Sequence, residues 1–323
     1  MTWKPAELAP GDEEPSSTHD RGKGYSNPAY AETLVDLGNP IRLDRSGGSL
    51  LKRTIPGSGL SDAVGPYPIF ACSGWASLEA DLADLEGQFV TVCLVTDPLG
   101  DWTFENLRLA FPDHLEAFKN HYVVDLSGDP LSSVTKHHRR NIRRAQRELR
   151  VEQVVDAAGF LGEWLELYQS LIARHAVTGA AAFSKKSFAL QLALDDVVVF
   201  RAVHGDVTVG ATLWMTGSQA AYYHLGAYSD MGYELGASFA LFAHALSFFA
   251  GHDLAWASLG AGAGLDGDAT DGLTRFKQGW ATETRTAFIC GRVLYESGYA
   301  ELTTRVADAP VKFFPPYRAG SPK

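Results

Sequence analysis

The chain has 323 residues, of which 46% are hydrophobic and 11% aromatic, with a formal net charge of −10. This composition is typical of a folded globular protein, and the acidic charge argues against broad binding to nucleic acid or anionic membranes. No run approaches the ~18 apolar residues of a membrane-spanning helix. Three cysteines without metal-site spacing predict reduced thiols and no metal, and the first residues lack a signal-peptide pattern, so we expect a cytoplasmic protein.

The first part of the chain predicts one α/β unit, which we place at residues 36–150. Residues 1–35, before it, are rich in Pro, Gly, Ser and charge and predict a disordered arm. Leucines at helical spacing predict a short helix over residues 78–85, packed on a buried strand over 89–95. A second strand over 122–126 ends at a Ser-Gly-Asp-Pro turn.

A basic helix follows, which we predict over residues 130–149. Pro130 suits a first helical turn, and no further Gly or Pro interrupts the run. Residues 136–150 carry seven Lys/Arg and one acid. One face of the helix presents four of these cations at steps of four and three residues: Lys136, Arg140, Arg143 and Arg147. Such a face either binds phosphates or is a solvated, ion-paired surface.

The second unit, residues 151–305, begins with an amphipathic helix over 161–172. Two close turn signals then separate three β-rich runs between residues 197 and 228, which predicts an antiparallel meander. A long amphipathic helix over 232–250 comes next. The later elements are a strand over 254–259, a helix near Leu273 and a strand over 284–294. We expect residues 306–323 to form a tail that packs back on the first unit.

Three segments resemble the FemABX-like transferases, and the order of elements resembles a GNAT acyltransferase core. The first segment is HYVVDLSGDPLSSVTKHHRRNIRRAQREL (121–149), with a DLS turn and an R-x-N-I-R-x-A helix. The others are YYHLGAYSDMGYELGASFALFAHAL (222–246) and DGLTRFKQGW (271–280), which carries an FK-x-G-aromatic signature. The resemblance implies two fused GNAT-like units of mixed α/β class, each a mostly antiparallel sheet flanked by helices. It also implies transfer of an acyl or aminoacyl group to an amine, without a cofactor.

The donor site follows from the same resemblance. GNAT enzymes hold the acyl-CoA pyrophosphate on the amides of a helix N-terminus, which here corresponds to Gly236 and Ser238. The turn lacks a basic residue and carries Glu234, which would repel a pyrophosphate, and it is otherwise an ordinary helix start. We therefore favour aminoacyl-tRNA over acyl-CoA as donor, bound by the basic helix and by Arg275.

The catalytic candidates are Lys277, His224 and Asp271. The ammonium of Lys277, in the FK-x-G signature, would stabilise the oxyanion of the tetrahedral intermediate or hold a donor phosphate, unless it is a surface lysine. His224, in the third meander strand, would deprotonate the attacking amine, unless it is a hydrogen-bonded core histidine. Strand alternation puts it on one face with Tyr222 and Tyr228.

The acceptor candidates are aromatic and acidic. Tyr67 lies in a Gly/Pro/Tyr stretch resembling the acceptor-site lining of FemABX-like proteins, unless it is a packed turn residue. Tyr222 and Tyr223 lie on the same predicted strand as His224. Asp266 and Asp268 lie in a Gly-rich loop that could bind a cationic acceptor; the loop lacks the terminal Glu of an EF-hand, so we expect no metal.

The sequence thus predicts an acyltransferase or aminoacyltransferase whose partners are a small-molecule amine acceptor and tRNA. Peptidoglycan or natural-product biosynthesis would be its setting. An acetyl-CoA-dependent GNAT N-acetyltransferase and a non-catalytic GNAT-like binding scaffold remain alternatives.

Overall fold

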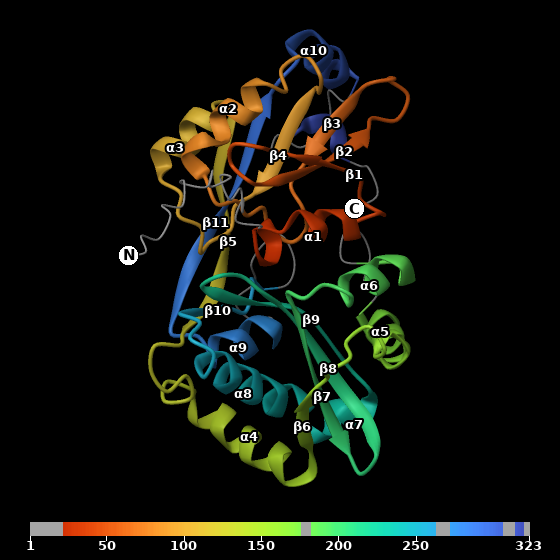
Figure 1. The fold of residues 1–323 in the computed structure, drawn as a ribbon, viewed down its shortest axis with the longest axis vertical. Helices are drawn as coiled ribbons and strands as arrows, with labels where there is room; N and C mark the ends of the chain where they lie inside the picture. The colour runs from red at the N-terminus through yellow and green to blue at the C-terminus, as the bar shows by residue number, and fades with distance from the viewer. Residues whose placement is uncertain (1–21, 176–181, 263–271, 306–313, 320–323) are drawn as a thin grey trace, which may run out of the picture.

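The computed structural model describes residues 22–175, 182–262, 272–305 and 314–319. They are built on one sheet of eleven strands (Figure 1). The strands are β1 (Asn39–Arg42), β2 (Ser49–Thr54), β3 (Ser61–Val64), β4 (Thr91–Val95), β5 (His114–Asp125), β6 (Arg150–Gln153), β7 (Val197–His204), β8 (Val207–Thr216), β9 (Ala220–Tyr228), β10 (Trp256–Ser258) and β11 (Glu283–Val293). Their spatial order is β1-β2-β3-β4-β11-β5-β10-β9-β8-β7-β6.

The sheet has two halves with the same pattern of strand directions. Neighbouring strands are antiparallel except for β3 with β4 in one half and β9 with β10 in the other. In each half an antiparallel run is followed by this parallel pair, and the halves meet at the long pair β5 and β11, which runs between the upper and lower parts of Figure 1. The mixed α/β class with a mostly antiparallel sheet is confirmed, and the two units share one continuous sheet.

Helices cover both faces of this sheet. They are α1 (Pro28–Thr33), α2 (Leu78–Ala83), α3 (Phe104–Ala110), α4 (Lys136–Glu148), α5 (Leu161–His175), α6 (Lys185–Gln191), α7 (Asp230–Leu235), α8 (Ala237–Ala250), α9 (Gly272–Gln278) and α10 (Glu296–Thr304), with the 3-10 turns η1 (Gly24–Ser26), η2 (Trp75–Ser77) and η4 (Pro316–Arg318). The helix predicted over 232–250 is two helices, because Gly236 takes a left-handed φ of 71° between α7 and α8. The basic helix begins later than predicted, where the Thr135 side chain caps α4.

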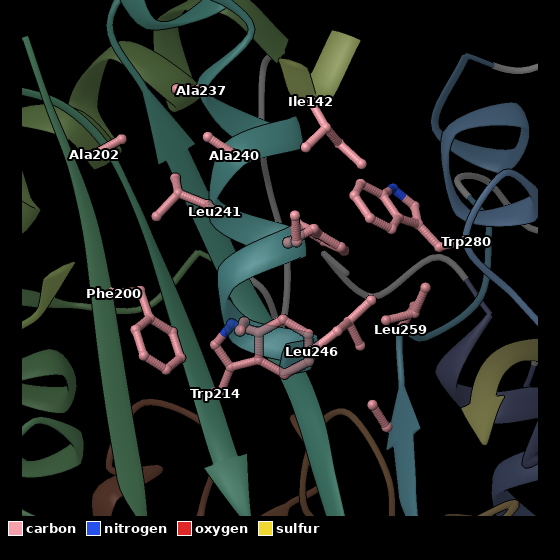
Figure 2. Close-up of a cluster of buried hydrophobic side chains, with 14 of the residues drawn as sticks. Ile142, Phe200, Ala202, Trp214, Ala237, Ala240, Leu241, Leu246, Leu259 and Trp280 are labelled. Atoms are coloured by element: carbon pink, nitrogen blue, oxygen red, sulfur yellow. The ribbon is translucent and has the colours of Figure 1, made fainter. Parts of the chain in front are cut away.

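On one face of the second half, α4, α8 and α9 enclose an apolar core. Figure 2 shows Ile142 of α4 pointing toward Trp280, which follows α9, while Trp214 of the sheet lies between Phe200, also of the sheet, and Leu246 of α8 in this view. Burying such side chains contributes about 1.5–3 kcal/mol each. This core fixes α4 and α9 relative to β9 and β10.

On the opposite face, a second core gathers η1, α1, α5 and α6. Tyr25, Tyr30 and Leu34 are all buried in it. The disordered arm predicted over residues 1–35 is therefore ordered from residue 22 onward, and α1 lies between the two halves in Figure 1. This short segment is held by tertiary packing and by the Asn27 cap of α1, which a search for apolar periodicity does not detect.

The chain crosses between the halves twice. The helix α4, which the predicted boundary at residue 150 assigns to the first unit, packs against α8 of the second. The end of the chain returns to the first half, where Tyr317 Oη lies 2.7 Å from Thr91 Oγ1 and Arg318 Nε donates to Asp62 Oδ2 at 2.8 Å. These contacts join residues 314–319 to the first half, while the predicted packing of the whole tail over 306–323 stays a prediction.

Candidate functional site

The parallel strands β9 and β10 pair over three residues and then diverge. Trp256–Ser258 of β10 lies opposite Ala220–Tyr222 of β9. Beyond this point the backbone after β10 stays with β5, because Leu259 N donates to Tyr122 O at 2.8 Å, whereas β9 continues to Tyr228 beside β8. In the described chain, the later part of β9 therefore has no strand partner on its β10 side, and its peptide groups are available to a ligand. We call this place the strand divergence.

Lys277 reaches the strand divergence from the last turn of α9. The residue is only 5% exposed, and its Nζ donates to Ala261 O at 2.6 Å. The same atom lies 5.8 Å from the ring centroid of Tyr223. A Cβ at Gly260 would come within 3.2 Å of it, so the glycine leaves room for the ammonium. A buried ammonium at this place is suited to stabilising negative charge on a ligand, and it is not a surface lysine.

A β-bulge at His224 breaks the alternation predicted for β9. The register with β8 shifts there, so that His224 and Leu225 both point toward the core of η1, α1, α5 and α6. Tyr228 packs on the opposite face, against α8. A bulge inserts one extra residue, and every side chain after it changes face relative to a strictly alternating strand.

Both ring nitrogens of His224 are engaged. Its Nδ1 lies 2.9 Å from Tyr25 Oη, and its Nε2 lies 3.2 Å from Gln191 Oε1. Since the amide oxygen of Gln191 can only accept, Nε2 carries the proton and Nδ1 accepts from the tyrosine hydroxyl. Burial lowers the pKa of His224 to about 4, so the ring is neutral at pH 7 and its lone pair is used by Tyr25.

A carboxyl group that the sequence analysis did not single out faces the same region. Asp97 is buried just after β4, and Tyr222 Oη donates to its Oδ2 at 2.6 Å. Burial raises the pKa of Asp97 to about 6, although the bonds from Tyr222 and the Leu99 amide and the charge of Arg285 oppose the rise. The contact joins the two halves of the molecule. The sequence signal that could have identified Asp97 is the position of a polar residue just after a predicted buried strand.

The predicted acceptor tyrosines divide between two faces of the sheet. Tyr67 and Tyr222 are joined through the aromatic pair Tyr25 and Tyr30: Tyr30 Oη donates to Tyr67 O at 2.5 Å, and the rings of Tyr25 and Tyr222 lie 5.2 Å apart. Tyr223 lies on the other face, near Lys277.

The acidic part of the predicted site cannot be placed. Asp266, Asp268 and Asp271 lie outside the described residues, so their acceptor and catalytic roles stay predictions.

The predicted donor-binding cations lie at the surface. Lys136, Arg140, Arg143 and Arg147 of α4 are all exposed, and none forms an ion pair within the described ranges. At 1.5 Å per residue, this row extends roughly 16 Å along the helix. Arg275 is exposed on α9, on a different side from buried Lys277.

The turn between α7 and α8 lies next to the same helix. A Cβ at Gly236 would be 4.0 Å from the Ala145 side chain, and Arg144 Nη2 donates to Glu234 O at 3.5 Å. Ser238, in the first turn of α8, is partly buried. The structure thus brings the basic helix and the GNAT-like turn together, with Arg144 as a positive group beside the turn.

Three further observations concern metal sites, membrane spans and thiols. Within the described residues, no group of three His, Cys, Asp or Glu side chains is placed to hold a metal ion. No helix among them is long and apolar enough to cross a membrane. The three cysteines are free thiols, and burial raises the pKa of Cys93 to about 12.

Comparison with known proteins agrees with this geometry. Residues 132–278, from α4 to α9, match the family model described as acetyltransferase (GNAT) domain. The crystal structure of FemX is similar over 84% of this chain and 93% of its own, with a TM-score of 0.61 and 14% identity. The chain thus matches the GNAT family over residues 132–278, and most of it shares the fold of FemX.

Two other solved structures share the FemABX/GNAT-like fold. The C-terminal domain of a putative lysylphosphatidylglycerol synthetase from Agrobacterium fabrum is similar over 87% of this chain and 93% of its own, with a TM-score of 0.57 and 13% identity. L-PGS from Bacillus licheniformis is similar over 83% of this chain and 92% of its own, with a TM-score of 0.55 and 15% identity. No curated protein sequence matches the chain significantly. The match over residues 132–278 supports a GNAT-type acyltransferase, and the three solved structures share its fold.

Proposed function

We propose that this FemABX/GNAT-like protein transfers an aminoacyl group from aminoacyl-tRNA to an amine acceptor. The observation that carries the proposal is the buried ammonium of Lys277 at the strand divergence, beside peptide groups of β9 that have no partner on the β10 side. Attack on an ester carbonyl creates an oxyanion, and preorganised positive charge stabilises it more strongly than the neutral carbonyl.

Asp97 is the base in this proposal. Its carboxyl, with a pKa of about 6, is mostly ionised at pH 7 and can take a proton from an attacking ammonium. The amine nitrogen then forms a bond to the ester carbonyl carbon, the bond from that carbon to the tRNA 3′ oxygen breaks, and the leaving oxygen receives the proton from Asp97. The second proton that the nitrogen loses passes to the carboxylate of Asp97, now ionised again, and from there to solvent. His224, whose two nitrogens are engaged, would hold Tyr25 and Gln191 in place beside Tyr222. No metal or redox cofactor takes part in this scheme.

The choice of donor rests on α4. Its exposed row of cations, from Lys136 to Arg147, fits the phosphates of an RNA strand better than the single pyrophosphate of acyl-CoA. The amides at the start of α8, after the left-handed Gly236, favour acyl-CoA as the second candidate donor. The acidic Glu234 beside that turn counts against it.

Titration with total tRNA and, separately, with acetyl-CoA at two salt concentrations tests the donor. We expect tRNA to bind with an affinity that falls steeply with salt, and acetyl-CoA to leave the melting temperature unchanged. Stabilisation by acetyl-CoA alone would assign an acyl-CoA donor, and no response to either ligand would favour a non-catalytic scaffold.

A further inference from the structure

His121 on β5 is a buried histidine with a ring nitrogen that is unpaired among the described residues. It is 8% exposed, and its Nδ1 is buried with no hydrogen-bond partner in the part of the chain that the structure describes. The other buried histidines differ: both nitrogens of His138 lie within hydrogen-bond distance of Thr135 and Phe276, as those of His224 do of Tyr25 and Gln191. An unpaired buried nitrogen lowers stability, and its presence in a native fold calls for an explanation such as a ligand.

The strand register places His121 beside the strand divergence. Val123 of β5, Ser258 of β10 and Tyr222 of β9 lie opposite one another in a row across the sheet. His121 is two residues from Val123, so it shares that face, which is the face where Tyr222 binds Asp97. The next residue, Tyr122, donates its N–H to Gly260 O at 3.1 Å, in the segment that has parted from β9.

The charges around His121 keep it neutral. Burial, followed by the positive charges of Lys277 and Lys119, lowers its pKa to about 3. Arg285 lies opposite it on β11. The same positive field would favour the neutral form of an amine bound there, and only the neutral form can attack a carbonyl.

We propose that His121 binds the acceptor amine: its unpaired Nδ1 accepts a hydrogen bond from the amine N–H and directs the nitrogen lone pair toward the carbonyl beside Lys277. This inference rests on the proposed function and adds a positioning residue to it. A neutral imidazole with the proton on Nε2 offers one acceptor, so it orients an amine without competing with Asp97 for the proton.

The test compares His121→Phe, His121→Asn and the control His114→Phe, a half-buried histidine on the same strand. Hydroxylamine serves as the smallest amine acceptor and a mixed pool of aminoacyl-tRNA as donor, with hydroxamate as the product. We expect His121→Phe to raise the KM for hydroxylamine about tenfold and to leave the KM for tRNA unchanged. His121→Asn should recover part of the loss, because its amide oxygen can accept near the position of Nδ1, and His114→Phe should behave as wild type.

Thermal melting provides a readout that a structural histidine would not give. Phenylalanine removes the unpaired nitrogen, so His121→Phe should melt at a higher temperature than wild type. A lower melting temperature with an unchanged hydroxylamine KM would overturn the inference while the wild type remains active. A wild type that forms no hydroxamate from aminoacyl-tRNA beyond the spontaneous reaction measured without protein would instead overturn the proposed function, and the same KM comparison with acetyl-CoA as donor would then decide the role of His121.

Discussion

At the scale of single residues, the account depends on a lysine whose charge is buried. Lys277→Met keeps the length of the side chain and removes the ammonium from the strand divergence. We expect kcat to fall about 100- to 1000-fold, the usual loss for one oxyanion-stabilising group. Lys186→Met, at an exposed lysine on α6, is the matched control and should keep the wild-type rate. Full turnover by a folded Lys277→Met protein would remove the assigned role.

The pKa of Asp97 gives the reaction a pH dependence. Because the ionised carboxyl is the base and its pKa is about 6, the rate should be constant above pH 7 and fall about tenfold per pH unit well below 6. Asp97→Asn should be slow at every pH and lose this limb. A pH–rate profile of kcat/KM for both proteins measures this fall in rate at low pH. The same fall in Asp97→Asn would assign the titrating group to another residue.

The ionisation of Asp97 also changes the free energy of unfolding with pH. The pKa of Asp97 is raised from about 4 to about 6 on folding, so its protonated form favours the folded state, and that contribution is lost as pH rises through 6. Asp97→Asn should therefore be more stable than wild type at pH 8, by up to roughly 3 kcal/mol, and the difference should shrink toward pH 4. Urea denaturation at the two pH values tests this.

At the scale of elements, α4 is the proposed contact surface for the donor. Replacing Arg140 and Arg143 by Gln removes two exposed cations that form no ion pair with the described residues. We expect tRNA affinity to fall and the slope of log K against log salt to decrease by about 2. Arg108→Gln, an exposed arginine on α3, is the control. An unchanged slope in the double variant would place the RNA elsewhere.

The elements that the sequence predicted are those whose pattern is local. The meander of β7, β8 and β9 and the helix α5 follow from alternation and from 3.6-residue periodicity within one segment. The break at Gly236 and the bulge at His224 do not show in periodicity. Asp97 was missed because its partner Tyr222 is 125 residues away in the chain, so only the folded sheet brings them together.

At the scale of the whole molecule, the C-terminal segment is held to the first half by a buried carboxylate. Asp62 of β3 is fully buried between Arg53 and Arg318, and Arg318 Nη2 donates to its Oδ1 at 2.9 Å. Asp62→Ala would leave two guanidinium groups without this carboxylate and should lower the free energy of unfolding by roughly 3 kcal/mol. Asp44→Ala, which removes an exposed ion pair with Arg42, should change it by less than about 0.5 kcal/mol. Equal stability of the two variants in denaturant would contradict this.

The most direct test of the central claim is a transfer assay with radiolabelled donors. Purified protein is mixed with an amine acceptor and either a pool of labelled aminoacyl-tRNA or labelled acetyl-CoA, and the label appearing in an amide product is measured for wild type and Lys277→Met. The account predicts amide formation from aminoacyl-tRNA by wild type and almost none by Lys277→Met. Label transferred from acetyl-CoA alone, or equal transfer from aminoacyl-tRNA by both proteins, would contradict it.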